Sequence, residues 1–154
     1  MPSALPPVMP SGEPGCFTCD LSRCVVCDSH LVQTDTFHSM VTSETFHIRH
    51  HMTCQTSNLV YLLFCNKCPN SQYVGETQNT LKQRFYLHRS NINQNTGTHV
   101  TRHFNQADHS LANLRCITIE KQKSDSREQR LKREDFWKYK LKTIFPNGLN
   151  TPNH

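Results

Sequence analysis

The sequence predicts an α+β fold, because its expected elements follow in the order strand, strand, helix, helix, strand, helix. Two short apolar, β-favouring runs, residues 58–64 and 71–77, flank a turn rich in Asn, Pro and Ser, which is typical of a hairpin. Residues 79–92 and 125–143 instead show the apolar spacing of helices. A third strand is expected at residues 114–120, where the pattern alternates again. We therefore expect a small sheet with helices packed against it.

The first predicted helix follows the hairpin at once. Thr77 or Asn79 is expected to cap its N-terminus. Arg84 and His88 lie four residues apart and should share one face of this helix. A loop and a short helix over about 99–106 come next. The buried stripe of the first helix is expected to consist of Leu81, Phe85, Leu87 and Ile92.

The last predicted helix is the longest and the most basic. Ser124 or Asp125 is expected to cap it, and Pro146 and Gly148 lie beyond its end. Its apolar side is predicted to contain Leu131, Phe136, Trp137 and Leu141. Seven basic residues form either a solvated face or a stripe that faces DNA. These are Arg127, Arg130, Lys132, Arg133, Lys138, Lys140 and Lys142. In the strand before this helix, Cys116 is expected to be a small buried hydrophobic residue.

Composition limits the possible classes of protein. The 154 residues suit one domain with a small appendage, and 35% hydrophobic content predicts a modest core. The net charge of +5 is compatible with a nucleic-acid partner but does not require one. No apolar run is long enough to span a membrane, and the N-terminus lacks the pattern of a signal peptide. We therefore expect a nuclear or cytoplasmic protein that is not secreted and makes no membrane contact.

Three segments are expected along the chain. Residues 1–15 hold five of the eight prolines and predict a flexible or extended arm. Residues 16–54 are rich in cysteine and are interpreted as a zinc-binding linker, with one or two short strands in its second half. Residues 55–154 contain the predicted sheet and its helices and should form the main domain.

Eight cysteines and ten histidines in this chain point to metal binding. In a reducing compartment, paired cysteines favour zinc over disulfides. Two Cys-x-x-Cys pairs, Cys16 with Cys19 and Cys24 with Cys27, lie four residues apart and could complete one tetrahedral Zn²⁺ site. Because that spacing is short, Cys54 is an alternative fourth ligand, with Cys16 left out. Free thiols, or disulfides in an exported chain, are the competing interpretation.

A third Cys-x-x-Cys pair, Cys65 and Cys68, falls in the turn of the predicted hairpin. It needs two more ligands, and the nearest suitable residues are His103 and His109. His99 is a competing ligand, since it lies one helical turn before His103. Two thiolates and two neutral imidazoles form an ordinary structural zinc site.

The two hairpin strands carry tyrosine triplets, Leu59-Val60-Tyr61 and Tyr73-Val74-Gly75, and a helical Arg84 follows. This order resembles the GIY-YIG nuclease domain, with Leu59 where the family motif has glycine. A longer ordered set resembles the GIY-YIG endonuclease of Penelope-like retroelements, together with its upstream cysteine-rich linker. It includes Cys65-x-x-Cys68, Tyr73-Val-Gly-Glu-Thr77, Arg84-x-x-x-His88, His103-Phe104, His109-Ser110, Arg133-Glu134-x-Phe-Trp137 and Gly148-Leu-Asn150.

The resemblance implies a three-stranded antiparallel sheet and a DNA substrate, with a reverse transcriptase or element RNA as a further partner. Hydrolysis of a phosphodiester needs an activated water and stabilisation of the charge on the phosphate. We expect Tyr61 to be the base and Tyr73 to position it, with the reverse assignment open. Arg84 is expected to clamp the phosphate, and His88 to orient the nucleophile or assist proton transfer.

The remaining two candidates are a carboxylate and an amide. Glu134 is the best ligand for a catalytic Mg²⁺ or Mn²⁺, and Glu76 is a weaker one. Asn150 resembles the family's terminal asparagine and is expected to hold the substrate or a tyrosine. Two other functions compete with this one: a zinc-stabilised nucleic-acid-binding module without catalysis, and a secreted disulfide scaffold. The nuclease hypothesis alone requires both tyrosines, Arg84 and Glu134 to meet around one cleft.

Overall fold

The computed structural model describes residues 12–152, so most of the arm predicted for residues 1–15 lies outside the described residues. Its centre is an antiparallel sheet of three strands in the order β6-β5-β7. The strands are β5 (Ser57–Cys65), β6 (Tyr73–Thr80) and β7 (Leu114–Lys121). The predicted α+β class is therefore confirmed. Within the described residues, the structure holds no helix long and apolar enough to span a membrane.

The β5–β6 hairpin brings the two tyrosines onto one face of the sheet. Leu63 pairs with Tyr73, and Tyr61 pairs with Gly75. Because side chains alternate along a strand, these four positions share a face, and Tyr61 and Tyr73 are diagonal neighbours on it. Their rings meet edge to face, with centroids 6.4 Å apart.

Helix α2 (Leu81–Gln94) packs against this tyrosine-bearing face. Thr80 caps it in a capping box with Gln83, so the predicted caps, Thr77 and Asn79, were wrong by one to three residues. The buried residues are Leu81, Phe85, His88 and Ile92, at spacings of four, three and four. Leu87 was expected in this stripe, but the helical period leaves it 47% exposed and gives the buried position to His88.

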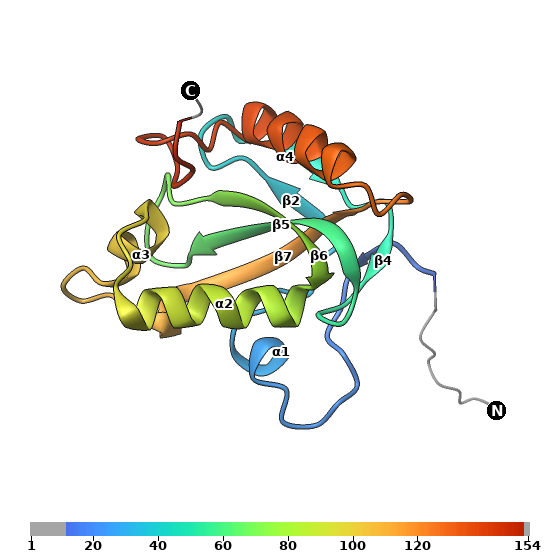
Figure 1. Cartoon of the computed structure of the whole chain (residues 1–154), viewed down its shortest axis with the longest axis horizontal. Helices are drawn as coiled ribbons and strands as arrows, with labels where there is room; N and C mark the ends of the chain where they lie inside the picture. The colour runs from blue at the N-terminus through green and yellow to red at the C-terminus, as the bar shows by residue number, and fades with distance from the viewer. Residues whose placement is uncertain (1–11, 153–154) are drawn as a thin grey trace.

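Helix α4 (Arg127–Leu141) lies on the opposite side of the sheet from α2 and the short α3 (His99–Phe104), as Figure 1 shows. Ser126 caps it rather than the predicted Ser124 or Asp125. Trp137 and Leu141 are buried as predicted, whereas Phe136 is exposed and Leu131 is only half-buried.

Arg130 was assigned to the basic surface of α4, and this was wrong. Its side chain is buried, and its guanidinium donates to the Glu76 carboxylate at 2.8 Å, to Asn58 Oδ1 at 2.9 Å and to the Asp125 carbonyl at 2.8 Å. A buried guanidinium is tolerated when its donors are satisfied in this way. The contact fixes the start of α4 to β5 and β6.

The N-terminal segment packs onto the sheet. It contains β1 (Gly15–Cys16), α1 (Val25–Ser29), the β2–β3 hairpin (Thr36–His38 and Thr45–His47) and β4 (His51–Met52). Along the outer edge of β7, Val32 donates to the Cys116 carbonyl and Cys116 donates to the His30 carbonyl, both at 3.0 Å. This pairing protects an edge strand that would otherwise be open.

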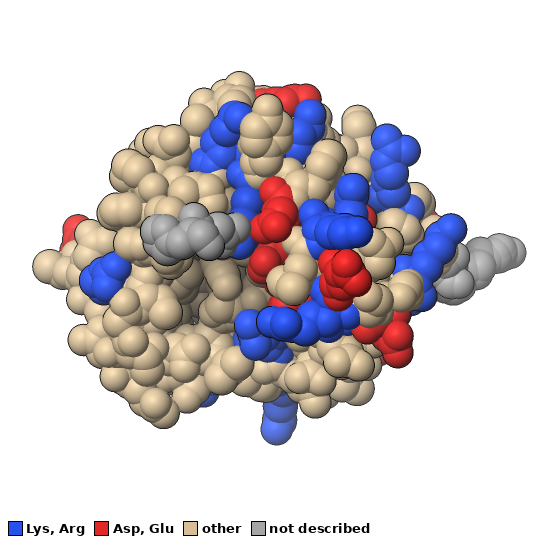
Figure 2. Space-filling model, turned by 45° about the horizontal axis from the view of Figure 1, so that its top comes forward, with Lys and Arg blue, Asp and Glu red and all other residues tan. Residues whose placement is uncertain are grey.

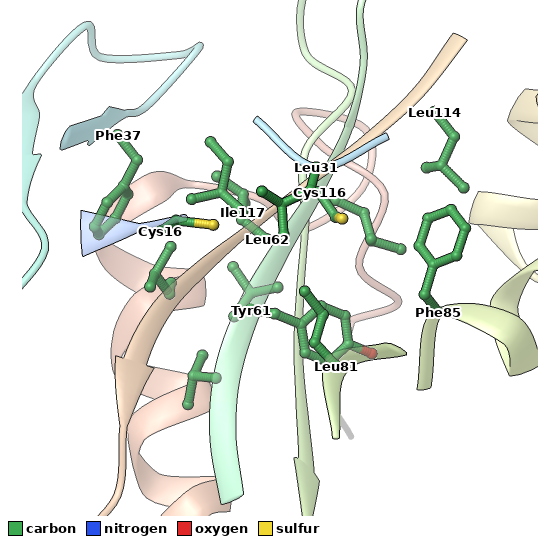
Figure 3. Close-up of a cluster of buried hydrophobic side chains, with 14 of the residues drawn as sticks. Cys16, Leu31, Phe37, Tyr61, Leu62, Leu81, Phe85, Leu114, Cys116 and Ile117 are labelled. Atoms are coloured by element: carbon green, nitrogen blue, oxygen red, sulfur yellow. The ribbon is translucent and has the colours of Figure 1, made fainter. Parts of the chain in front are cut away.

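Both segments contribute to one hydrophobic core. Figure 3 shows Cys16 and Leu31 of the N-terminal segment against Leu62, Cys116 and Ile117 of the sheet. Cys116 is fully buried, as predicted for a small hydrophobic residue. The modest hydrophobic content is thus concentrated in a single cluster.

The pairing of Tyr61 with Gly75 yields the first prediction. A Cβ at position 75 would collide with the Tyr61 ring. We expect Gly75→Ala to lower the free energy of unfolding by about 1–3 kcal/mol, the usual cost of overpacking a core. Urea denaturation measures it, in the wild type and in a Tyr61→Leu background. The loss should be much smaller in that background, and an equal loss in both would contradict the proposed collision.

Candidate active site

A cavity of about 360 Å³ lies beside β6, between α2, α3, α4 and the C-terminal segment. All of the predicted catalytic side chains except one line it. These are Tyr73 of β6, Arg84 and His88 of α2, Glu134 of α4, and Asn150. Of the four groups that the nuclease hypothesis requires around one cleft, Tyr73, Arg84 and Glu134 line this cavity and Tyr61 does not.

Tyr61 lies behind the cavity wall. Its side chain is 0% exposed, and its hydroxyl contacts His88 Nε2 at 2.6 Å and receives a hydrogen bond from Arg84 Nε at 3.3 Å. Solvent cannot reach this hydroxyl in the structure, whereas Tyr73 lines the cavity. The geometry thus favours the reverse of the expected roles, with Tyr73 facing the cavity and Tyr61 holding Arg84 and His88.

The surroundings disfavour ionisation of both tyrosines. Burial raises the pKa of Tyr61 well above its usual value, and the neighbouring Tyr73 adds to the effect. Burial also raises the pKa of Tyr73, with the Glu134 carboxylate as the next cause. Burial alone would lower the pKa of Arg84, but the two tyrosines and Glu76 raise it overall, so its positive charge is secure.

His88 is neutral at physiological pH. Burial, followed by the charge of Arg84, lowers its pKa to about 4. Because the Tyr61 oxygen already accepts from Arg84, its own proton is directed to His88 Nε2. The three side chains form a chain of hydrogen bonds from a charged donor to a neutral acceptor, and both ends of this chain line the cavity.

Glu134 presents a carboxylate to the cavity with one close cationic partner, Lys138 Nζ, at 3.4 Å. Burial raises the pKa of Glu134, and nearby Glu76 raises it further against the opposing effect of Lys138. The ionised form of a buried carboxyl group with a second carboxylate nearby is disfavoured unless a positive charge is added. Oxygen ligands of this kind fit a hard divalent cation such as Mg²⁺ or Mn²⁺.

Asn150 is held by the backbone of β6. Its side-chain amide accepts from Val74 N at 2.8 Å and donates to Val74 O at 2.9 Å, and Thr143 Oγ1 donates to its Oδ1 at 2.7 Å. The side chain therefore pairs with the outer edge of the sheet as a neighbouring strand would. Since Val74 follows Tyr73, this amide positions the Tyr73 backbone rather than a tyrosine hydroxyl.

The model of the GIY-YIG catalytic domain matches residues 57–150. The chain belongs to the GIY-YIG family. The match starts with β5 and ends at Asn150, so the GIY-YIG domain contains every residue that lines the cavity except Thr151. This family is one of nucleases, which makes the domain an endonuclease domain at the superfamily level. No curated protein and no solved structure matches the chain.

Upstream of the GIY-YIG match, four thiols converge from Cys19, Cys24, Cys27 and Cys54, all within 4.8 Å of one another. Cys24 Sγ and Cys54 Sγ are 3.7 Å apart, close to the ~3.8 Å expected between sulfurs of a tetrahedral zinc site. Burial raises the pKa of Cys27 to about 11, so the Cys27 thiolate needs a neighbouring cation. Of the two alternative ligand sets, the geometry matches the one with Cys54.

Cys16, which the first of those sets included, lies elsewhere. It is buried in the core, and its sulfur accepts from Thr118 N at 3.4 Å. Its position in β1, which pairs with β4, directs the side chain toward the sheet. The Cys-x-x-Cys pattern at Cys16 was therefore a misleading indication of a ligand.

A second cluster brings together Cys65, Cys68, His103 and His109, again within 4.8 Å. Cys68 Sγ and His109 Nε2 are 3.1 Å apart, and Asp108 contacts the other ring nitrogen of His109 at 3.0 Å. His103 Nε2 is buried and has no hydrogen-bond partner among residues 12–152, as expected of a nitrogen that is reserved for a metal. These donors fit a structural Zn²⁺, with Asp108 orienting one ligand. The competing His99 is not among them.

Two cavity residues were assigned to other roles from the sequence. Lys138 was placed with the surface basic residues, but it lines the cavity and pairs with Glu134. The pair itself was expected as the alternative to a metal-binding role for Glu134, because the two residues lie four apart on one helix. Leu87, expected in the core, also lines the cavity. Its position three residues after Arg84, on the same helical face, could have shown this.

The two alternative ligand sets of the N-terminal zinc site, with Cys54 or with Cys16, predict different zinc contents for serine variants of these two cysteines. We expect the wild type to carry two zinc ions per chain, and Cys54→Ser to lose one of them because its site keeps only three ligands. Cys16→Ser is the matched control and should retain both. Atomic emission spectroscopy of the purified proteins measures the content. Loss of zinc from Cys16→Ser with retention in Cys54→Ser would refute this assignment.

The low pKa of His88 predicts a pH effect on stability. The unfolded histidine binds a proton near its usual pKa of 6.5, whereas the folded one does so only near 4. Stability from this group is thus full above pH 6.5 and is lost as the pH falls toward 4, by up to about 3 kcal/mol.

The comparison of the wild type with His88→Gln isolates this effect, because both proteins carry the same zinc ligands. We expect their difference in free energy of unfolding to shrink as the pH falls from 6.5 to 4. Chemical denaturation at a series of pH values tests it. A constant difference over that window would show that His88 is protonated normally in the folded protein.

Proposed function

We propose that this protein is a metal-dependent DNA endonuclease that nicks one strand. The observation that supports it best is the cavity, where Tyr73, Arg84 and Glu134 from three different elements face one space. A non-catalytic zinc-stabilised module would not require these groups to meet. Each of them also has the charge or the hydrogen-bonding capacity that phosphodiester hydrolysis needs.

Arg84 is proposed to bind the phosphate that is cut. Tyr61 occupies its Nε, which leaves the outer N–H groups of the fork for two phosphate oxygens. This contact also orients the guanidinium before the substrate arrives, so little ordering is needed on binding. Negative charge that develops on the phosphate in the transition state would be stabilised by a fixed positive group.

Tyr73 is proposed to act in its phenolate form and to accept the proton of the attacking water. The water oxygen would form its bond to phosphorus while the bond from phosphorus to the leaving sugar oxygen breaks, and the leaving oxygen would take up a proton from solvent. Tyr73 is the better candidate for the base because it lines the cavity, whereas Tyr61 is fully buried. Tyr61 and His88 would then position Arg84 and the cavity wall rather than contact the water.

Glu134 is proposed to hold the catalytic cation, with Mg²⁺ or Mn²⁺ as the ion. A divalent cation at this carboxylate would stabilise the negative charge on the leaving oxygen. It would also counteract the Glu134 charge, which raises the pKa of Tyr73. Such a cation would compete with Lys138, which pairs with Glu134 at 3.4 Å.

The surface charge supports DNA as the substrate. Figure 2 shows Lys and Arg side chains gathered over the face that carries α4, with acidic side chains among them. The exposed basic residues of this helix include Arg127 and Lys132. Such a face adjoins the cavity through Lys138 and could contact the backbone on either side of the cut.

We further propose that the nuclease is of the Penelope-like retroelement type. The ordered motifs support it, as does the four-cysteine cluster that lies just before the GIY-YIG match. A reverse transcriptase or the element RNA would then be a partner, and the nucleus the site of action.

Nicking of supercoiled plasmid in the presence of Mg²⁺ tests this function. We expect Arg84→Ala and Glu134→Gln to lower the rate by about 100-fold or more, because Arg84 would stabilise the charge of the transition state and Glu134 would hold the cation that does the same. Glu128→Gln is the matched control, since Glu128 is an exposed carboxylate on the same helix, and it should cut normally. Wild-type rates in both cavity variants, with an unchanged fold by circular dichroism, would exclude the proposed roles.

A further inference from the structure

A pair of stacked rings lies next to the cavity and takes no part in the proposed chemistry. The rings of His99 and Phe145 are parallel within 9°, and their centroids are 4.0 Å apart. His99 belongs to α3, and Phe145 follows α4 in the chain. Figure 1 shows these two parts of the chain side by side.

Both rings are anchored to residues that line the cavity. His99 lies between Thr98 and Val100, which are both lining residues. The Phe145 backbone donates to the Asn150 carbonyl at 2.8 Å, and Asn150 also lines the cavity. His99 is therefore next in the chain to residues of the cavity wall, and Phe145 is joined to that wall by one backbone hydrogen bond.

The stack is held in place yet remains open to solvent. Arg102 contacts His99 Nδ1 at 2.9 Å and donates to the Gly97 carbonyl, which fixes the imidazole ring. Phe145 is nevertheless 47% exposed, although a phenyl ring gains most from burial. An ordered aromatic ring with an open surface beside a nuclease cavity offers a flat apolar surface and a neighbouring positive charge.

Those properties suit a nucleobase. Every base has an apolar π face that stacks on aromatic side chains, and the Arg102 guanidinium could meet the adjoining phosphate. A base within a duplex is already stacked on both sides, so it cannot use such a surface unless it leaves the helix. The matching ligand is therefore an unpaired base.

We propose that the Phe145–His99 stack binds one unpaired nucleobase of the DNA strand whose phosphate enters the cavity. This rests on the proposed function, and it names the substrate class: DNA that is single-stranded, or that has an unpaired nucleotide, next to the cut. Phe145 thereby determines specificity and takes no part in the chemical step.

Binding of DNA that contains 2-aminopurine tests the proposal with no need for cleavage. The full-length, zinc-loaded protein is mixed, without added Mg²⁺, with single-stranded oligonucleotides that carry the probe at successive positions. Stacking on an aromatic ring quenches this base. We expect quenching at one or two positions and, for Phe145→Ala, loss of that quenching with a Kd about 5- to 150-fold weaker.

Three controls separate stacking from other effects. Phe145→Trp should restore the quenching, because the larger ring also stacks. Tyr86→Ala removes an exposed aromatic ring from α2 at a position outside the cavity lining, and it should bind as the wild type does. A fully paired duplex of the same sequence should bind wild type and Phe145→Ala with equal affinity. Equal weakening of paired and unpaired DNA by Phe145→Ala, or no weakening of either, would overturn the proposal.

The plasmid assay keeps this result distinct from the nuclease hypothesis. If the wild type stacks 2-aminopurine through Phe145 but, once Mg²⁺ is added, cuts neither the plasmid nor the single-stranded oligonucleotides, the base site stands and the catalytic proposal fails. If cleavage depends on Arg84 but the probe is not quenched, the stack is not a base site and the nuclease proposal is retained.

Discussion

The hydroxyl of Tyr61 is the contact on which the rest of the site depends. It joins β5 to α2 by its contact with His88 Nε2 at 2.6 Å and by accepting from Arg84 Nε at 3.3 Å. Its ring can lie there only because Gly75 on the neighbouring strand has no side chain. One residue of the hydrophobic core therefore sets the position of two residues that face the cavity. Core packing and site geometry are not separable in this domain.

The fold was predictable where local patterns and packing agree. The alternation of apolar and polar residues, together with the turn residues, predicted the bounds of β5, β6 and β7 to within a few residues. It did so because the sheet buries the side chains that the alternation marks as apolar. Helix stripes were less reliable. Leu87 was expected inside because it is apolar, although the period selects His88. The sequence could not show that a buried tyrosine hydroxyl gives that histidine a partner.

The site was predictable as a set of residue types but not as a set of roles. Residue order indicated which groups meet, whereas burial decides which of them reaches solvent, and burial depends on the tertiary structure. That is why Tyr61 and Tyr73 were assigned in the order opposite to the one their exposure favours. Arg130 was misassigned for the same reason, because its partner Glu76 lies on a strand far away in the sequence. Long-range ion pairs leave no periodic pattern.

The helices that form the cavity walls bury apolar residues in the core, and polar contacts and metal ligands add further ties between these walls. Asn150 fastens the C-terminal segment to the edge of β6 through Val74. The cluster of Cys65, Cys68, His103 and His109 links the hairpin turn to the end of α3. Helix α3 forms one wall of the cavity and carries the ring of His99. A short helix of this kind is marginal alone, and a bound metal adds free energy only to the folded form. The second zinc site would therefore govern the shape of the cavity as well as the stability of the fold.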